Sequence, residues 1–355
     1  MTQAQSESSE YLLLESVLRL FSDHVTPALL FAVERGDWPS ALWDSIAEMG
    51  LPRALLPEEA GGYGMSAVEV LSLLREAGRA GLPVPLAETM LAGWLLAGAG
   101  LPIPDGPLAF IFGHDFDLLT DGFGWRLTGV ARGVAWGRAV AAAAILVEVE
   151  EQSFVALLRP SDWKFEPVIG LAGEPHDVLR FDTMLSPDVV RPAAAGIGPA
   201  QLRAAGAVAR SLMMAGALQR ITDMTVQYAG ERHQFGKPIG RFQAVQQNLA
   251  VLASQAAAAT AAADLGVSAF VDGLRLPAIA VAKSRAGEAA GIGAAIAHQI
   301  HGAIGVSHEH SLHFLTRRLW AWRDEYGGES EWNMLLGRHL AAGGPDRLWI
   351  ELIAL

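Results

Sequence analysis

The hydrophobic pattern changes twice along this chain of 355 residues, and that change most constrains its fold. Residues 10–105 carry apolar side chains at helical spacing, as in YLLLESVLRLFSDHV. Short apolar runs such as AAAILVEVEE then follow, bounded by Gly, Pro and Asp as strands are, before long alanine-rich helical runs return. We therefore expect a multidomain α and β protein: an N-terminal α-helical domain over 1–105, a small middle β domain over 106–193 and a C-terminal helical bundle over 194–355.

Local signals place several element boundaries in this scheme. Gly50 followed by Pro52 predicts the end of a helix, because Gly adopts the left-handed conformation and Pro cannot continue a helix. Ser66 with Glu69 three residues later predicts a capping box at the start of the next helix. In the middle region, LAFIFGHDF, WRLTGVARGV, SFVALLRP and HDVLRFDTMLS are also expected to form strands.

Composition excludes several classes of function. The chain has no cysteine, which excludes disulfides, zinc–thiolate sites, iron–sulfur clusters and a cysteine nucleophile. A net charge of -12 argues against nucleic acid as a partner. The N-terminus lacks the pattern of a signal peptide, and the apolar stretches 91–101 and 139–147 are shorter than a bilayer span. We expect a soluble, cytoplasmic protein with no membrane partner.

A break between two long helical runs has a composition with two interpretations; it reads ERHQFGKPIGRFQAVQQNLA. Its Gly and Pro residues suit a tight connection between helices whose polar groups merely face solvent. However, it also gathers an arginine, two glutamines and two phenylalanines, and an arginine beside free backbone N–H groups can bind phosphate. The side chains concerned are Arg232, Gln234, Phe235, Phe242 and Gln243.

Five histidines fall within HQIHGAIGVSHEHSLHF at residues 298–314, which raises the question of a metal site. His298 and His301 are three residues apart, but no HExxH motif and no well-spaced carboxylate accompany them. We therefore predict no metal. Gly302 and Gly305 instead indicate a loop after a helix, with Gln299 and His301 beside it.

The two stretches ERHQFGKPIGRFQAVQQNLA and HQIHGAIG, together with PEEAGGYGMSAVEV, resemble signature sequences of the acyl-CoA dehydrogenases. The resemblance implies an α-helical domain, a β-barrel-like domain and a C-terminal four-helix bundle. It also implies FAD as cofactor, an acyl-CoA substrate and an electron-transfer flavoprotein as electron acceptor. In that family a glutamate removes the α-proton of the thioester, and hydride passes from the β-carbon to the flavin.

In the family, residues of these stretches reach across to the flavin of a neighbouring subunit. The resemblance assigns that contact here to Arg232, Gln234, Phe235, Phe242, Gln243, Gln299, Ile300, His301 and Gly302. Ala303 stands where the family has a second glycine.

The chain departs from the family at the flavin ring and at the base. No stretch like TEPxxGSD occurs in the middle region, and only Trp136 corresponds loosely to a WIT-like stretch. Gly327, in EYGGES, occupies the position of the family's glutamate. The alternative base position of some relatives falls near Ala207, which is no carboxylate either. Fallback bases would be Glu325 and Glu329, flanked by Asp324 and Glu331.

Three hypotheses follow from this asymmetry. The chain resembles the smaller, base-lacking subunit of bacterial heterotetrameric acyl-CoA dehydrogenases, some of which act in lipid or steroid catabolism. Such a half-site subunit would complete the FAD site of a partner chain. Alternatively, it forms a homo-oligomeric dehydrogenase with a relocated carboxylate base. A third alternative is a non-catalytic scaffold or regulatory paralogue.

Overall fold

The computed structural model describes residues 3–113, 115–120 and 122–355, with side chains described from Leu12 onward. The chain forms two compact units. One unit comprises residues 23–70 and 83–206, and the other comprises Met1–Ser22, Leu71–Leu82 and Ala207–Leu355. Each unit is described by itself.

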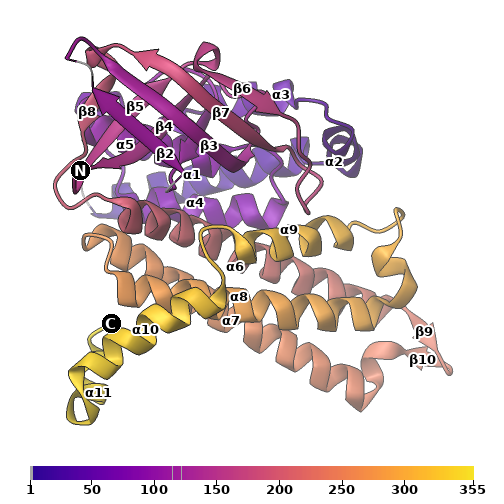
Figure 1. Ribbon diagram of the computed structural model, residues 1–355. Coiled ribbons are helices and arrows are strands. Elements are labelled where there is room, and N and C mark those ends of the chain that lie inside the picture. The colour runs from indigo at the N-terminus through magenta and orange to yellow at the C-terminus, as the bar shows by residue number, and fades with distance from the viewer. Residues whose placement is uncertain (1–2, 114, 121) are drawn as a thin grey trace. The chain divides into compact units, whose positions relative to one another are not determined.

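The first unit begins with helices and continues into strands (Figure 1). Thr26 starts α2 by accepting a hydrogen bond from the N–H of Leu29 at 3.2 Å. The predicted stop after α3 is confirmed, because Gly50 has φ +80°. Thr89 joins helix to sheet, since its hydroxyl accepts a hydrogen bond of 3.0 Å from the N–H of Leu108. The helices are α2 (Pro27–Glu34), α3 (Ser40–Glu48) and α5 (Leu86–Gly98), with 3₁₀ turns at Leu51–Arg53 and Glu58–Ala60.

The strands of this unit form two four-stranded sheets with orders β1-β4-β5-β8 and β2-β3-β7-β6. β1 and β4 are parallel, with Leu108 opposite Ala142, and the remaining pairs are antiparallel. The predicted strand LAFIFGHDF is divided, because its beginning belongs to one sheet and Phe116 starts a strand of the other. The strands are β1 (Leu108–Ile111), β2 (Phe116–Thr120), β3 (Trp125–Ala135), β4 (Ala142–Val149), β5 (Gln152–Leu158), β6 (Trp163–Glu166), β7 (His176–Leu185) and β8 (Val190–Pro192).

Alternation along the strands supplies a shared core between the two sheets. Phe116, Trp163 and Phe181 pack edge to face, with ring centroids 5.9 and 6.5 Å apart. Both sheets contribute aliphatic side chains to the same buried cluster, as expected for two sheets packed face to face. These include Ile111, Leu118, Leu127, Val134, Ile145, Val147, Leu158 and Leu179.

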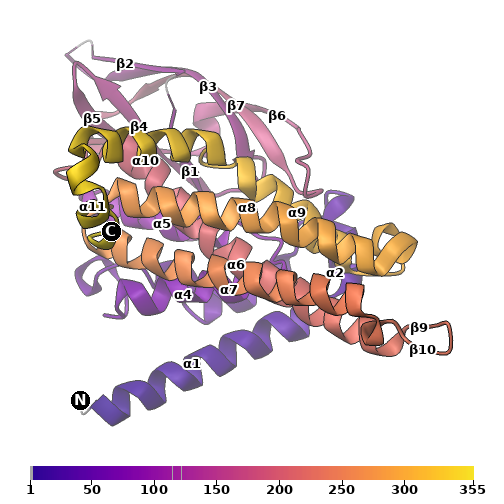
Figure 2. The same cartoon turned by 90° about the horizontal axis from the view of Figure 1, so that it is seen from below.

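The second unit is helical and contains the C-terminal bundle (Figure 2). Its helices alternate with short turns, and the order of helical, strand and helical segments confirms the predicted fold class. The elements are α1 (Gln3–His24), α4 (Ala67–Ala80), α6 (Pro199–Glu231), α7 (Gln243–Val271), α8 (Leu276–His301), α9 (Leu312–Asp324), α10 (Glu329–Gly343) and α11 (Leu348–Ile353).

Helices α4 and α6 approach closely through a reciprocal pair of glycines. A Cβ on Gly216 would lie 1.8 Å from the carbonyl oxygen of Arg75, and one on Gly78 would lie 2.1 Å from that of Met213. Two ion pairs flank the contact, Arg75 with Asp264 and Arg79 with Asp223. The predicted capping box at the start of α4 is confirmed, since the N–H of Ser66 donates to Glu69 at 2.9 Å and Glu69 N–H donates back at 3.2 Å.

Helix α7 lies along α8 in the bundle (Figure 2). By length and composition, α7 is long and apolar enough to cross a membrane, and it is the one such single helix among the described residues, whereas we expected no stretch of that length. About 39% of its most apolar window is buried within this chain.

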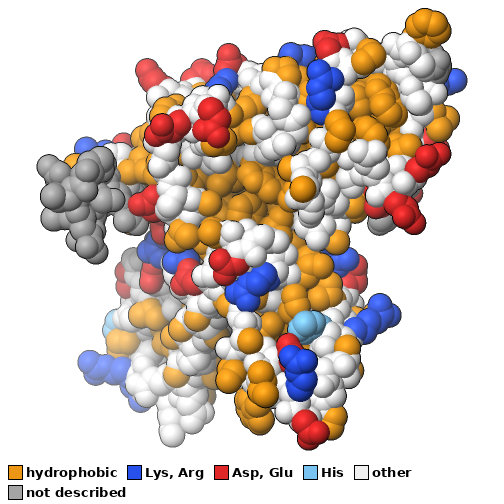
Figure 3. Space-filling model, turned by 90° about the vertical axis from the view of Figure 1, so that its left-hand side faces the viewer, with side chains coloured by type: hydrophobic (Ala, Val, Ile, Leu, Met, Phe, Trp, Pro, Cys, Tyr) orange, Lys and Arg blue, Asp and Glu red, His pale blue; other side chains and the backbone are white. Residues whose placement is uncertain are grey.

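The face drawn in Figure 3 shows basic side chains lying singly among acidic and hydrophobic ones.

Candidate functional site

The break between α6 and α7 forms a short hairpin. β9 (His233–Gln234) and β10 (Lys237–Pro238) pair antiparallel, leaving Phe235 and Gly236 as the two turn residues. Their φ angles are +53° and +80°, and positive φ at both central residues is what a type I′ turn requires. Asn or Gly usually occupies the first position, because a left-handed conformation costs other residues about 1–2 kcal/mol. The hairpin therefore holds a phenylalanine where its backbone conformation is unfavourable.

This hairpin presents its side chains to solvent. Phe235 is 91% exposed, and its ring meets that of Phe242 edge to face, with centroids 6.1 Å apart. The ammonium of Lys237 lies 4.3 Å from the centre of the Phe242 ring. Arg232 is exposed, and within the described residues its guanidinium has no ion-pair partner. Gln234 and Gln243 are also exposed. A strained turn with an exposed aromatic ring is more than a helix connection requires.

The second predicted segment lies at the end of α8. Gln299 is exposed, Ile300 is half-buried and His301 is 3% exposed. The helix ends where predicted, at Gly302, whose φ is +63° and whose N–H donates to the carbonyl of His298. Ala303, in the 3₁₀ turn that follows, is exposed. The donors of this segment therefore border a surface, while the imidazole beside them is buried.

The histidines form ring contacts with one another and with neighbouring aromatic residues. His301 stacks on Tyr228 of α6 at 4.5 Å and 20°, and His310 meets His301 edge-on at 4.7 Å. His298 shares a hydrogen bond of 2.8 Å with the hydroxyl of Thr316. Burial is the main cause that lowers the pKa of His298, His301 and His310. No three metal-binding side chains converge within the described part of the chain.

The turn at the expected base position is held by ion pairs. Gly327 has φ +97° and Tyr326 has φ +57°. On one side of the turn, Glu325 accepts a hydrogen bond of 2.5 Å from Arg210, whose guanidinium also lies 5.5 Å from the Tyr326 ring centre. On the other side, Glu329 accepts one of 2.7 Å from Arg323. Both fallback carboxylates are therefore engaged with arginines.

A buried lysine supports the same turn. Lys283 of α8 is 1% exposed, and its ammonium donates to the carbonyls of Arg323 at 2.6 Å and Gly327 at 2.8 Å. Burial lowers its pKa to about 8, opposed by the charges of Glu325 and Glu329. For Glu329, burial would raise the pKa, but the hydrogen bond from Arg323 and the nearby cations lower it below its ordinary value. A lowered pKa makes Glu329 a weaker base.

A cavity of about 560 Å³ adjoins this turn within the bundle. Glu329 is one of its lining residues, so this fallback carboxylate does face an open space. The Ser284 hydroxyl is also buried there and has no hydrogen-bond partner within the described residues. The lining consists of Val281, Ser284, Arg285, Glu288, Arg323, Glu329, Asn333 and Leu336.

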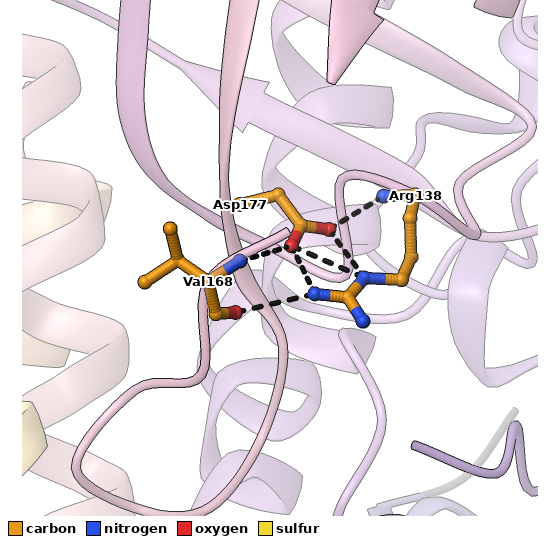
Figure 4. A network of polar contacts seen from close by, with 3 residues as sticks. All are labelled: Arg138, Val168 and Asp177. Carbon is orange, nitrogen blue, oxygen red and sulfur yellow. Dashed lines mark hydrogen bonds and ion pairs between the residues drawn. The ribbon is translucent and has the colours of Figure 1, made fainter. Parts of the chain in front are cut away.

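In the β unit, Trp136 is part of the core. Its ring is 2% exposed and meets that of Trp38 edge to face at 5.0 Å. Two residues later, Arg138 donates to the buried carboxylate of Asp177 through its backbone N–H at 2.8 Å and through its guanidinium (Figure 4). Asp177 also accepts the N–H of Val168 at 3.1 Å. The burial of Trp136 and its contact with Trp38 place its ring inside the core and not on an exposed face where a flavin could stack.

Comparison with known proteins agrees with this geometry. A family model described as "Acyl-CoA dehydrogenase, C-terminal domain" matches residues 204–337, and one described as "Acyl-CoA dehydrogenase, N-terminal domain" matches residues 7–102. The chain belongs to the acyl-CoA dehydrogenase family. The predicted family, enzyme class and cofactor are thus confirmed: this is a family of FAD-dependent oxidoreductases that act on CH–CH bonds.

Several relatives are similar over most of this chain. Acyl-CoA dehydrogenase IpdE2 of Mycobacterium tuberculosis is 30% identical, covering 86% of this chain and 89% of that protein. FadE34 of the same organism is 31% identical, covering 86% of this chain but 43% of that protein. A variant of the Tcur3481-Tcur3483 steroid ACAD has a TM-score of 0.86 at 25% identity, covering 95% and 99% of the two chains. The M. tuberculosis ChsE4-ChsE5 complex has a TM-score of 0.84 at 23% identity, covering 96% and 98%, and shows the fold.

Three residues of this region were not singled out from the sequence: Tyr228, Arg210 as a partner of Glu325, and Lys283. Lys283 interrupts the apolar run AIAVAKSRA, and a charged residue on a buried helix face could have indicated an internal partner. Tyr228 lies one turn before Arg232, but nothing local relates it to His301. The contacts of Lys283 with the Gly327 turn and of Tyr228 with His301 depend on tertiary packing.

Proposed function

We propose that this chain is a half-site subunit of an acyl-CoA dehydrogenase and completes an FAD site that belongs mainly to a partner chain. The observation that carries the proposal is a contrast within one chain. The hairpin around Arg232 is strained and exposed, whereas the base position holds Gly327 and both nearby carboxylates are engaged in ion pairs.

The donors at the hairpin and at the end of α8 suit a dinucleotide. The Arg232 guanidinium is a planar, permanently charged donor for pyrophosphate oxygens, and the amides of Gln234, Gln243 and Gln299 add neutral donors. Phe235 supplies an exposed ring on which an aromatic base can stack. We refer to these five residues as the nucleotide clasp. They fit the adenine and pyrophosphate end of FAD.

The residues at the family's flavin-ring and base positions fit the flavin ring of FAD less well than the nucleotide clasp fits the other end. Trp136 is buried between the sheets, and Gly327 has no side chain to remove a proton. When bound, FAD accepts hydride from the β-carbon of the acyl chain. In this proposal the α-proton is taken by a carboxylate of the partner chain, and the present chain binds and orients the nucleotide.

The relatives support a heteromeric, steroid- or lipid-directed assembly. The Tcur3481-Tcur3483 steroid ACAD and the ChsE4-ChsE5 complex each combine two different chains. By analogy, the proposed partners are a second acyl-CoA dehydrogenase subunit, a steroid- or lipid-derived acyl-CoA and an electron-transfer flavoprotein, in the cytoplasm.

A second candidate function has one observation in its favour. Glu329 lines the cavity of about 560 Å³, so a homo-oligomer using Glu329 as a relocated base has a space for substrate. Its ion pair with Arg323 and its lowered pKa weigh against that role. A scaffold that binds no nucleotide has no need for the nucleotide clasp.

The test is FAD retention by this chain copurified with a second acyl-CoA dehydrogenase subunit that it binds. Arg232→Ala removes the charged donor and should weaken FAD retention about tenfold or more, the effect of losing one charge-assisted hydrogen bond. Arg220→Ala is the matched control, because Arg220 is an exposed arginine on α6, the helix that ends directly before Arg232. Equal FAD retention in both variants would contradict the proposal.

A further inference from the structure

Tyr228 contacts both segments of the nucleotide clasp. It lies on α6 one turn before Arg232, and its backbone carbonyl accepts the N–H of Arg232 at 2.9 Å. Its ring stacks on the imidazole of His301 with centroids 4.5 Å apart and planes 20° apart. Its hydroxyl also donates to the backbone carbonyl of His301 at 3.4 Å. Tyr228 thus links two segments that are 73 residues apart in the sequence, with its backbone bonded to Arg232 and its side chain packed on His301.

The imidazole beneath Tyr228 is held in a fixed orientation. The Nδ1–H of His301 donates to the carbonyl of Ala297 at 2.8 Å, because a carbonyl can only accept. Its Nε2 is therefore an acceptor, and this buried nitrogen has no partner among the described residues. His310 packs edge-on to His301 with centroids 4.7 Å apart, and its ring also lies 6.3 Å from that of Tyr228. Burial keeps His301 neutral by lowering its pKa, so the contact with Tyr228 is a neutral aromatic stack.

Ordinary core packing does not account for this arrangement. Tyr228 is half-buried, and its hydroxyl reaches the last carbonyl of α8 instead of a polar group in the interior. The adjoining residues on both sides are exposed: Arg232 follows Tyr228 by one turn, and Gly302 follows His301 directly. The stack therefore lies beside two exposed segments, one carrying Arg232 and the other Gln299.

We propose that Tyr228 is a positioning residue for the nucleotide clasp. It holds the hairpin that carries Arg232 against the α8 end that carries Gln299, so that both act on one nucleotide. This inference rests on the proposed function. A dinucleotide gains affinity from two donor segments only when their separation is fixed before binding, because otherwise ordering them opposes binding.

The test uses FAD retention by the copurified complex, with five variants of this chain, one of them the Arg232→Ala variant described above. Tyr228→Leu removes the ring and the hydroxyl, whereas Tyr228→Phe keeps the stack. Val226→Ala is the matched control, since Val226 lies on the same helix and is 51% exposed. Combining Tyr228→Leu with Arg232→Ala completes a double-mutant cycle, which separates coupling from independent effects.

The expected result is a loss of FAD affinity of about tenfold for Tyr228→Leu, a smaller loss for Tyr228→Phe and none for Val226→Ala. The double variant should lose clearly less than the product of the two single losses, because the arginine is already misplaced without Tyr228. Strictly multiplicative losses, or an unaffected Tyr228→Leu, would overturn the positioning role. If Arg232→Ala itself has no effect, the proposed function fails instead.

Amide hydrogen exchange of the full-length chain alone provides an independent test that needs no partner. Tyr228→Leu should speed exchange at Ile239, whose N–H donates to the carbonyl of Arg232 at 2.8 Å, and at Gly302. Exchange in the distant α10 should match that of the Val226→Ala control. Unchanged exchange at both sites, or uniformly faster exchange through the whole bundle, refutes the inference.

Discussion

The ammonium of Lys283 donates a hydrogen bond of 2.8 Å to the backbone carbonyl of Gly327, the residue that stands where the family resemblance places a glutamate. A second hydrogen bond of 2.6 Å runs from Lys283 to the carbonyl of Arg323 at the end of α9. Together with the Arg210–Glu325 and Arg323–Glu329 pairs, these bonds fix the turn on both sides. In this chain the side chains around the turn at Gly327 hold its conformation and supply no base at that position.

The two carboxylates at this turn should therefore matter for stability and not for turnover. Glu325→Gln removes the carboxylate that pairs with the guanidinium of Arg210, which is 5% exposed, and the loss should cost roughly 1–3 kcal/mol of the free energy of unfolding. Glu329→Gln should cost less, because that pair is more exposed. Denaturant unfolding measures the stability, and bleaching of FAD by acyl-CoA in the copurified complex measures the chemistry. Loss of bleaching in Glu329→Gln with normal stability would instead identify Glu329 as the base.

The turn residue Phe235 should matter for FAD retention and not for stability. Phe235→Asn places a residue favoured in type I′ turns at φ +53°, so the free energy of unfolding should stay equal or rise by up to about 1 kcal/mol. FAD retention by the complex should nevertheless fall, because the exposed ring is lost. Phe123→Asn removes a phenylalanine that is 92% exposed elsewhere and should leave retention unchanged. A drop in stability without a drop in FAD retention would show that Phe235 serves only the fold.

The histidines predict how stability depends on pH. In the folded chain burial lowers the pKa of His298, His301 and His310, so the unfolded chain binds more protons just below the ordinary histidine pKa of about 6.5. Stability should be full above that value and should decrease as the pH falls below it. Unfolding midpoints between pH 7.5 and 5.5 test this, and His298→Gln should show a shallower decrease. Constant stability across that range is incompatible with buried neutral histidines.

The α4–α6 contact predicts a large effect of one methyl group. Gly216→Ala would place a Cβ 1.8 Å from the backbone oxygen of Arg75, forcing the helices apart at a cost of about 1–3 kcal/mol or more. Gly337→Ala is the matched control on α10, where an added Cβ meets nothing within 4 Å. That control should be neutral or stabilise by about 0.5–1 kcal/mol, because alanine is the better helix former. Thermal unfolding of the two variants compares them directly, and equal midpoints would contradict the close contact.

The features of the fold that could be predicted from the sequence are those set by neighbouring residues, such as helix caps and helix ends. The Ser66–Glu69 capping box and the helix ends at Gly50 and Gly302 depend on neighbouring residues, and they occur where expected. The division of LAFIFGHDF was not predicted, because one apolar run cannot show that its two ends belong to different sheets.

Long-range contacts at the candidate site could not be predicted in the same way. Tyr228 and His301 are 73 residues apart, and Lys283 and Gly327 are 44 apart. Their pairing follows from how the bundle helices pack, which periodicity does not specify. The residues of the nucleotide clasp were named from family resemblance, and their assignment to FAD remains a prediction.

Flavin stoichiometry tests the central claim most directly. The chain is purified alone and together with a second acyl-CoA dehydrogenase subunit that it binds, and bound FAD is measured per polypeptide. The half-site account predicts little FAD on the lone chain and about one FAD for every two chains in the complex. One FAD per chain on the lone protein, bleached by an acyl-CoA, would contradict it.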